Sequence, residues 1–224
     1  MLLDALPAEQ RADDEPRPEE AETQVIDEAD RAETEVIATE VTEPEVIKPE
    51  PRPDRTVSVR TPVSARVHGD QIDIVCAPAT EVPAVDGPAT ADVDGDAGTG
   101  FTLQARLGSD AAVLLPSAID LDLSAHGADF SLIGIDGTVS GDLHVGNVLI
   151  EGLFVDGISR IKANAGEVQL RLQAGSDVEV ISQCPATVYA EGLEHTGRGR
   201  WSLGDGTAKF EITGNLGSIT VTAL

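Results

Sequence analysis

The sequence predicts an all-β domain, a β-solenoid or β-helix of short strands punctuated by glycine, preceded by a disordered acidic tail. Three observations lead to this fold class. All 22 glycines lie at or beyond Gly69. Alternation of apolar and polar residues recurs from Val57 to the end of the chain, and no stretch beyond residue 56 has sustained helical spacing. A glycine-centred phrase also returns along the chain, which is typical of stacked β architectures.

The predicted tail spans residues 1–55. This segment holds 7 of the 13 prolines, 18 acidic and 6 basic side chains, and no glycine or aromatic residue. Such a segment has too little apolar surface to offset the backbone entropy lost on folding, about 1 to 2 kcal/mol per residue. We therefore expect a disordered segment over residues 1–55 and one folded domain over residues 56–224.

Five segments of the domain alternate as strands with one buried face do. They span residues 72–75, 101–105, 119–123, 168–172 and 178–180. Their apolar residues are mostly valine, isoleucine and leucine, and the whole chain has only four Phe, one Trp and one Tyr. Small side chains suit the narrow interior of stacked strands better than the wide interior of a sandwich. A twisted sandwich is the alternative.

The repeated phrase is a glycine, usually an acidic residue, and then alternating apolar positions. It begins at Gly127, Gly141, Gly166 and Gly217, and its first apolar residues follow one another at distances of 13, 25 and 51 residues. These distances are close to multiples of one unit, which predicts repeated levels of turn and strand. We expect the glycines to lie in turns and the acidic residues to serve turn geometry.

The phrase and the segment 113–121, in which Leu115-Pro116 leads into a strand pattern, resemble the bacterial putative adhesin family DUF4097 over about residues 57–224. The resemblance implies a β-helix-like fold and a non-enzymatic structural or interaction role, with a surface adhesin as an alternative. Residues 140–145 are similar to bactofilin polymers, which implies self-assembly through the ends of the solenoid as another alternative. The alternating residues 219–222 are one candidate edge for it.

Three aspartates suggest a remote alternative, a carbohydrate-active β-helix enzyme. Asp129, Asp142 and Asp156 would form an acid and base pair if they projected from successive levels. Glycine followed by aspartate is also a common turn pair, which favours a structural role. The four histidines are scattered and form no catalytic pattern with serine or cysteine. We therefore expect no enzyme and no cofactor.

Two further patterns bear on metal binding. Residues 92–98 place aspartates at alternate positions as a calcium loop does, but Ala97 and Leu103 stand where the loop needs glycine and a bidentate acid. We expect a polar turn there and no metal. Cys76 and Cys184 match no metal spacing, so we expect two buried or half-buried thiols. A disulfide is the alternative if the protein is exported.

The tail repeats the pattern Thr-x-Val-Ile at residues 23–26 and 34–37. The pairing of Thr23 with Ile26, and of Thr34 with Ile37, resembles the phosphothreonine motif read by FHA domains. This implies a Ser/Thr kinase and an FHA-domain protein as partners of the tail. The alternatives are a weakly helical, solvating tail and addition of the Val-Ile pairs as strands to a partner's sheet.

The formal net charge is −25 at pH 7, and both parts of the chain are acidic. An acidic surface disfavours nucleic acid and anionic membranes as partners, because both repel it. No apolar run is long enough to span a bilayer, and the first residues lack the basic leader of a signal peptide. We therefore expect a soluble cytoplasmic protein.

Overall fold

The structure, a computed structural model, describes residues 59–78 and 80–224. This part of the chain contains fifteen β-strands and no α-helix. The strands join in one large mixed sheet, so the predicted all-β class is confirmed. Residues 1–55, for which we predicted disorder, and their boundary with the domain lie outside the described residues.

The strands have the following bounds: β1 Thr61–His68, β2 Gln71–Ala77, β3 Ala84–Asp86, β4 Ala89–Asp96, β5 Gly100–Leu107, β6 Ala112–Pro116, β7 Ala118–His126, β8 Asp129–His144, β9 Asn147–Leu153, β10 Ile158–Leu172, β11 Val178–Ser182, β12 Thr187–Glu191, β13 Glu194–Gly197, β14 Arg200–Leu203 and β15 Ala208–Ala223.

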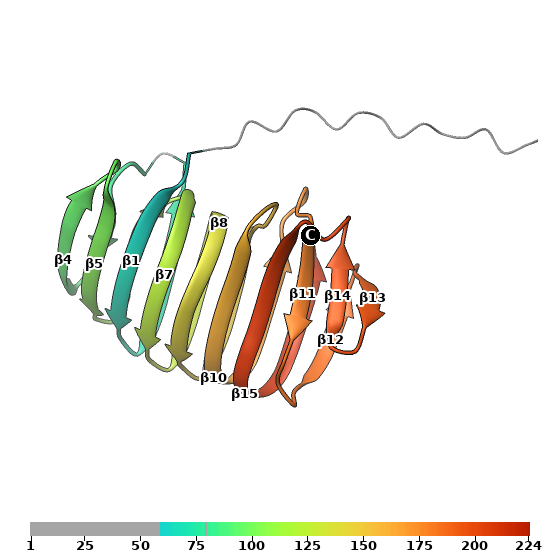
Figure 1. The fold of residues 1–224 in the computed structure, drawn as a ribbon. Coiled ribbons are helices and arrows are strands. Elements are labelled where there is room, and N and C mark those ends of the chain that lie inside the picture. The colour runs from blue at the N-terminus through green and yellow to red at the C-terminus, as the bar shows by residue number, and fades with distance from the viewer. Residues whose placement is uncertain (1–58, 79) are drawn as a thin grey trace, which may run out of the picture. The chain divides into compact units, whose positions relative to one another are not determined.

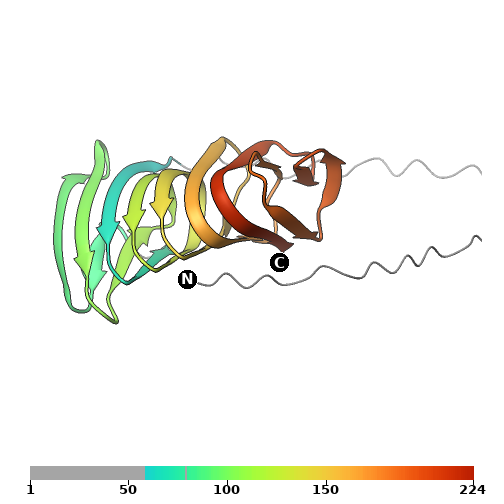
Figure 2. The ribbon, with the colours of Figure 1, turned by 90° about the horizontal axis from the view of Figure 1, so that it is seen from below.

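The sheet is organised in two rows of strands that enclose the core (Figure 2). Row 1 runs, in spatial order, β4, β5, β1, β7, β8, β10, β15, β11, β14 and β13 (Figure 1). Row 2 runs β3, β6, β2, β8, β9, β10, β15 and β12. The long strands β8, β10 and β15 take part in both rows, which joins the rows into one sheet.

Each passage of the chain through row 1 and then row 2 forms one level, and neighbouring levels pair in parallel. The levels follow in the order β5–β6, β1–β2, β7–β8, β8–β9, β10, β15 and β11–β12. Chain order differs from this spatial order at both ends. The level β1–β2, first in the described chain, lies second in the stack, and the last strand, β15, lies between β10 and the level β11–β12.

This order corrects the predicted assembly edge at residues 219–222. Ile219 is fully buried and lies in register with Val168 of β10 on one side and Val188 of β12 on the other. A strand paired on both sides offers no free backbone groups to another molecule. The C-terminal strand is therefore internal to the stack.

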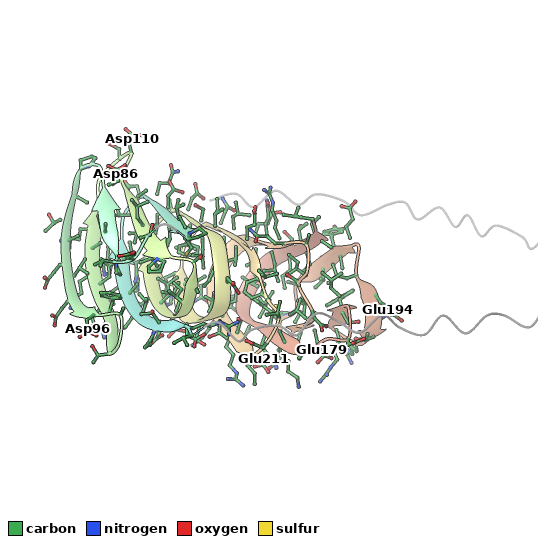
Figure 3. The ribbon with its side chains drawn as sticks, turned by 90° about the horizontal axis from the view of Figure 1, so that it is seen from above. Asp86, Asp96, Asp110, Glu179, Glu194 and Glu211 are labelled. Carbon is green, nitrogen blue, oxygen red and sulfur yellow. The ribbon has the colours of Figure 1, made fainter. Side chains whose placement is uncertain are left out.

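Antiparallel strands close row 1 at both ends and one end of row 2. β4 pairs antiparallel with β5, and β3 pairs antiparallel with β6. At the other end, β14 pairs antiparallel with β11, and β13 follows it. Acidic side chains project from both ends, among them Asp86, Asp96 and Asp110 at one end and Glu179 and Glu194 at the other (Figure 3).

The core consists of the inward positions of both rows. Valine, isoleucine, leucine and alanine dominate it, as the alternation predicted, and the five predicted segments lie within β2, β5, β7, β10 and β11. All four phenylalanines are also buried. Phe154 and Phe210 meet edge to face with ring centroids 5.1 Å apart, an arrangement that aromatic pairs favour.

The glycines of the repeated phrase differ from the prediction in where they lie in each level and in why glycine is needed there. Gly127, Gly166 and Gly217 lie where each level passes from row 1 to row 2, but none has a positive φ. A Cβ atom on Gly217 would come within 2.6 Å of the carbonyl oxygen of Gly166 in the next level. Glycine is therefore needed for the close approach of neighbouring backbones rather than for a left-handed turn.

Gly141 does not belong to this series. It lies within β8 in row 1, in register with Leu123. The equivalent corner is occupied by Gly146, whose backbone approaches Ala128 of the neighbouring level. The phrase that begins at Gly141 therefore stands at a different point of the level from the other three.

The register of row 2 shows which residues are equivalent in neighbouring levels. Phe130 pairs with Val148, and Val148 in turn pairs with Val168. The predicted unit, taken from the distance between Phe130 and Leu143, was wrong. Leu143 pairs with Ala125 in row 1, so that distance joins residues of opposite rows.

Candidate functional site

The four tail residues predicted to dock a partner, Thr23, Ile26, Thr34 and Ile37, lie outside the described residues. The FHA-domain partner and the kinase stay predictions. The other candidate residues all lie in the part of the chain that the structure describes.

The three aspartates of the glycosidase alternative do not come together. Asp129 lies in row 2, where the amide of Asn147 donates a 2.8 Å hydrogen bond to it. Asp142 lies in row 1 and is exposed. Asp156 follows β9 and accepts a 2.5 Å hydrogen bond from Arg60, with which it forms an ion pair. The three do not project together from successive levels, because the long strand β8 carries Asp129 and Asp142 in different rows.

The alternating aspartates at 92–98 belong to the β4–β5 hairpin, which confirms the predicted polar turn. Oδ1 of Asp96 accepts hydrogen bonds from the backbone N–H groups of Thr99, at 2.9 Å, and Gly98, at 2.8 Å. These bonds, that from Thr99 first, lower the pKa of the Asp96 carboxyl, because they stabilise its charged form. Within residues 59–78 and 80–224, no group of three or more His, Cys, Asp or Glu side chains is placed to hold a metal ion.

Both cysteines are free thiols, as predicted, and no disulfide joins them. Cys76 is buried in β2, and burial raises the pKa of its thiol to about 12, because an apolar environment disfavours the thiolate. Cys184 is half-buried after β11, with its sulfur 3.3 Å from Oγ of Ser182.

Three of the histidines that look scattered in the sequence form a continuous stack on row 1. His68, His126 and His144 end three neighbouring strands in register. The ring of His126 lies 5.0 Å from each neighbouring ring, with 22° between the ring planes in both pairs. All three side chains are exposed. We call these three residues the histidine row.

Polar groups extend the histidine row on both sides. Arg106 of β5 lies in register with His68. On the other side, the amide of Asn164 lies 3.2 Å from Nδ1 of His144, and the amide of Asn215 donates a 3.4 Å hydrogen bond to Asn164. From Arg106 to Asn215, the six strands carry no carboxylate at this position.

Sequence reasoning missed the histidine row because its members come from strands far apart in the chain. All of β2 to β6 lies between His68 and His126 in the sequence, since β1 is inserted between β5 and β7 in the stack. One signal was present. The separation of His126 and His144 in the chain equals that of the paired residues Phe130 and Val148.

A hollow of about 410 Å³ lies on row 2. Two of its carboxylates are held by neighbours: the hydroxyl of Ser131 donates a 2.6 Å hydrogen bond to Asp73, and Asn147 donates to Asp129. Carboxylates held in this way have a structural role, because their hydrogen bonds join neighbouring strands of row 2.

The edge of row 2 beyond β12 is open. Among the described residues, β12 pairs only with β15, while β14 and β13 extend row 1 further. A hollow of about 690 Å³ lies here, lined in part by Cys184, Val188 and Trp201. Tyr189 of β12 is 62% exposed. An open edge with apolar groups beside it is a surface to which an extended peptide can add.

Comparisons with known proteins give one structural similarity. No family model matches the chain, and no match was found among curated proteins. The chain is similar to a solved structure described as a putative cell adhesion protein from Clostridium sporogenes, with 11% sequence identity and a TM-score of 0.43. The match covers 73% of this chain and 92% of that protein. Among the described residues, no helix is long and apolar enough to cross a membrane.

Proposed function

We propose that this protein is a non-enzymatic scaffold in which a rigid β-solenoid carries the acidic tail as a docking segment for a protein partner. The observation that carries the proposal is the in-register parallel pairing of successive levels in both rows. Each level buries its apolar face between its neighbours, so the stack holds its shape without a cofactor. Such a stack displays fixed rows of polar side chains to partners.

The first and last strands of the described domain, β1 and β15, lie inside the stack, which supports a scaffold that resists a pulling force. β1 follows directly after the tail in the chain and is paired with β5 on one side and β7 on the other. β15 is likewise paired on both sides. A pull on either strand must break two ladders of backbone hydrogen bonds, whereas an edge strand would yield after one.

We propose a cytoplasmic location. The free thiols of Cys76 and Cys184 support it, because disulfides are rare in reducing compartments and common in exported proteins. A surface adhesin is the alternative implied by the sequence resemblance. Fractionation of cells that express the tagged protein separates the two locations.

The docking role of the tail is tested by capture of partners from a lysate. The full chain and a chain of residues 56–224 serve as baits. We expect specific partners to be captured by the full chain and lost with the shorter one. If both baits capture the same partners, the partners bind the folded domain and not the tail.

Dependence on phosphothreonine is a separate test. The full chain is phosphorylated by a bacterial Ser/Thr kinase, and binding to an FHA domain is measured by calorimetry. The double variant Thr23→Ala, Thr34→Ala is expected to lose binding. Thr42→Ala, which changes a tail threonine followed three residues later by glutamate, is the matched control and is expected to bind as the parent does. Equal binding by the double variant would refute the phosphothreonine motif.

Self-assembly is the second candidate function, favoured by the open edge of β12. It predicts sedimentation that depends on concentration and is reduced by Tyr189→Asp. Thr90→Asp on β4 adds the same charge at the opposite end and is the control. Equal sedimentation of the two variants would exclude assembly through β12.

We propose that the protein lacks glycosidase activity. The parent and Asp142→Asn are assayed side by side on a broad panel of glycans, and no hydrolysis is expected from either. Hydrolysis by the parent that Asp142→Asn loses would contradict the proposal.

A further inference from the structure

The histidine row and its neighbours form a strip on row 1 whose charge differs from the rest of the acidic chain. Two outward positions of these strands carry three permanent cations. Arg106 stands in register with the histidines, and Arg66 and Lys162 stand two residues earlier on their strands. Two carboxylates face them across the same strands, Asp92 of β4 and Asp142 of β8. With Asp70, which lines a hollow beside the row, as the third carboxylate, three cations face three carboxylates, and the strip is close to neutral before any histidine takes up a proton.

Two shallow hollows lie beside this strip. One, of about 420 Å³, is lined by Arg66, His68, Asp92 and Arg106 among others. The second, of about 460 Å³, is lined by His68, Asp70, Arg106 and His126 among others. His68 and Arg106 line both hollows, so both hollows lie at the β5 end of the strip. Among the described residues, neither Arg66 nor Arg106 forms an ion pair.

Protonation makes the strip strongly positive. Histidine side chains generally change charge between pH 5 and 8. Two imidazolium charges about 5 Å apart repel each other by about 0.8 kcal/mol in water and by about 3 kcal/mol where the effective dielectric constant is 20. An anion bound along the row relieves this repulsion. Binding of an anion and uptake of protons therefore favour each other.

Every charged group near the row bears on this balance. Arg106 on β5, Arg66 on β1 and Asp92 on β4 line a hollow with His68, and Asp70 lies just beyond β1. Asp142 lies two residues before His144 on β8, in register with Lys162 on β10. The bound anion is the one group that opposes the mutual repulsion along the whole row.

The shape of the strip selects the kind of anion. The same position recurs on neighbouring strands about 4.8 Å apart, so the ligand is linear and repetitive. Guanidinium and protonated imidazole groups donate hydrogen bonds, and both bind phosphate oxygens well. Row 1 also carries carboxylates outside the strip, among them Glu211, which is ion-paired with Arg160, and Asp96 at the end of the row (Figure 3). A narrow polymer meets the strip alone, whereas a flat anionic membrane would also meet those carboxylates.

Nucleic acid fits less well than a polymer without bases. Single strands are held by aromatic side chains on which bases stack. Among the described residues, the rings of the histidine row stack on one another, and the other exposed large aromatic side chain, Tyr189, lies on β12 in row 2. A linear polyanion of phosphates alone needs no such platform.

We propose that the histidine row, with Arg106 and Arg66, binds linear inorganic polyphosphate, and that binding strengthens as the row takes up protons. The histidine row belongs to the folded domain, so the inference stands whether or not the tail docks a partner.

The test is calorimetric titration of the full chain with polyphosphate of defined length at pH 6 and pH 8, at constant salt. Binding is expected to tighten about tenfold per pH unit for each proton that binding takes up. It is therefore expected to be tighter at pH 6 than at pH 8. His126→Gln keeps a polar side chain at the centre of the stack and is expected to weaken binding about tenfold at pH 6 and little at pH 8. Arg106→Gln is expected to weaken binding at both pH values.

His195→Gln is the matched control, because His195 lies on β13 beside Trp201 and outside the row. We expect it to bind as the parent does. Circular dichroism of all variants at both pH values checks that they are folded.

Four results would overturn the proposal. These are no binding at pH 6, equal binding at both pH values, equal loss in His126→Gln and His195→Gln, and tighter binding of single-stranded DNA, a polyuronate or orthophosphate than of polyphosphate. The last result would assign the strip to another ligand.

Discussion

Replacement of Ile219 by alanine tests whether the C-terminal strand lies inside the stack. Ile219 is fully buried, with Val168 of β10 on one side and Val188 of β12 on the other. Isoleucine to alanine at such a site costs about 2 to 5 kcal/mol, because strands on both sides limit the collapse of the cavity. That loss is a large part of a typical stability of about 5 to 15 kcal/mol.

The assay is urea unfolding of the parent and the variant, followed by circular dichroism and Trp201 fluorescence. At an m value of about 2 to 3 kcal/mol/M, the midpoint is expected to fall by about 1 M or more with an unchanged slope. Ile158→Ala is the matched control, since Ile158 lies on the adjacent β10 and is 41% exposed. We expect it to cost less than about 1 kcal/mol.

The reasoning is refuted if Ile219→Ala unfolds at the same urea concentration as Ile158→Ala. That result would mean that β15 is an exposed edge. Self-assembly through residues 219–222 would then return as a candidate.

Three further predictions concern single residues. Gly141→Ala should destabilise the domain by about 1 to 3 kcal/mol, because the added Cβ would lie 2.9 Å from the carbonyl carbon of Leu123; an unchanged urea midpoint would contradict the close packing of the levels. In the native protein at pH 8, a thiol reagent should modify Cys184 well before Cys76, whose pKa is raised to about 12 by burial, and Cys76 should react after unfolding; equal rates would be inconsistent with this burial. The pKa of Asp96 is lowered from 3.8 in the folded state, so its contribution to stability is present above that pH and is lost as the pH falls through the folded value. The stability difference between the parent and Asp96→Asn should therefore shrink between pH 4 and pH 2, and a constant difference would show that the charge of Asp96 does not matter.

The predicted features that the structure confirms all depend on short stretches of sequence. The alternation at residues 72–75 or 168–172 has a period of two, so it specifies a strand and the face that it buries. The aspartates at 92–98 accept hydrogen bonds from backbone groups within three residues. Their role as a polar turn follows from local chemistry alone.

The errors arose where contacts join residues far apart in the chain. Gly141 and Gly146 both precede a strand-like pattern, and nothing within a few residues of either shows which row it occupies. The choice depends on how β8 crosses between the rows at Asp136, which pairs with Leu153 in row 2 and with Ala118 in row 1. A change of register by one residue reverses the face that each side chain occupies.

The sequence by itself determined that the folded part is all-β, that its core is built from small apolar side chains and that its thiols are sheltered. The tertiary structure decided the order of the levels, the burial of β15 and the assembly of the histidine row. These depend on pairings such as Glu167 of β10 with Ser218 of β15, between which β11 to β14 intervene in the chain. Such pairings are selected by the packing of the whole stack, because each level buries its apolar face only when the correct neighbours are in place.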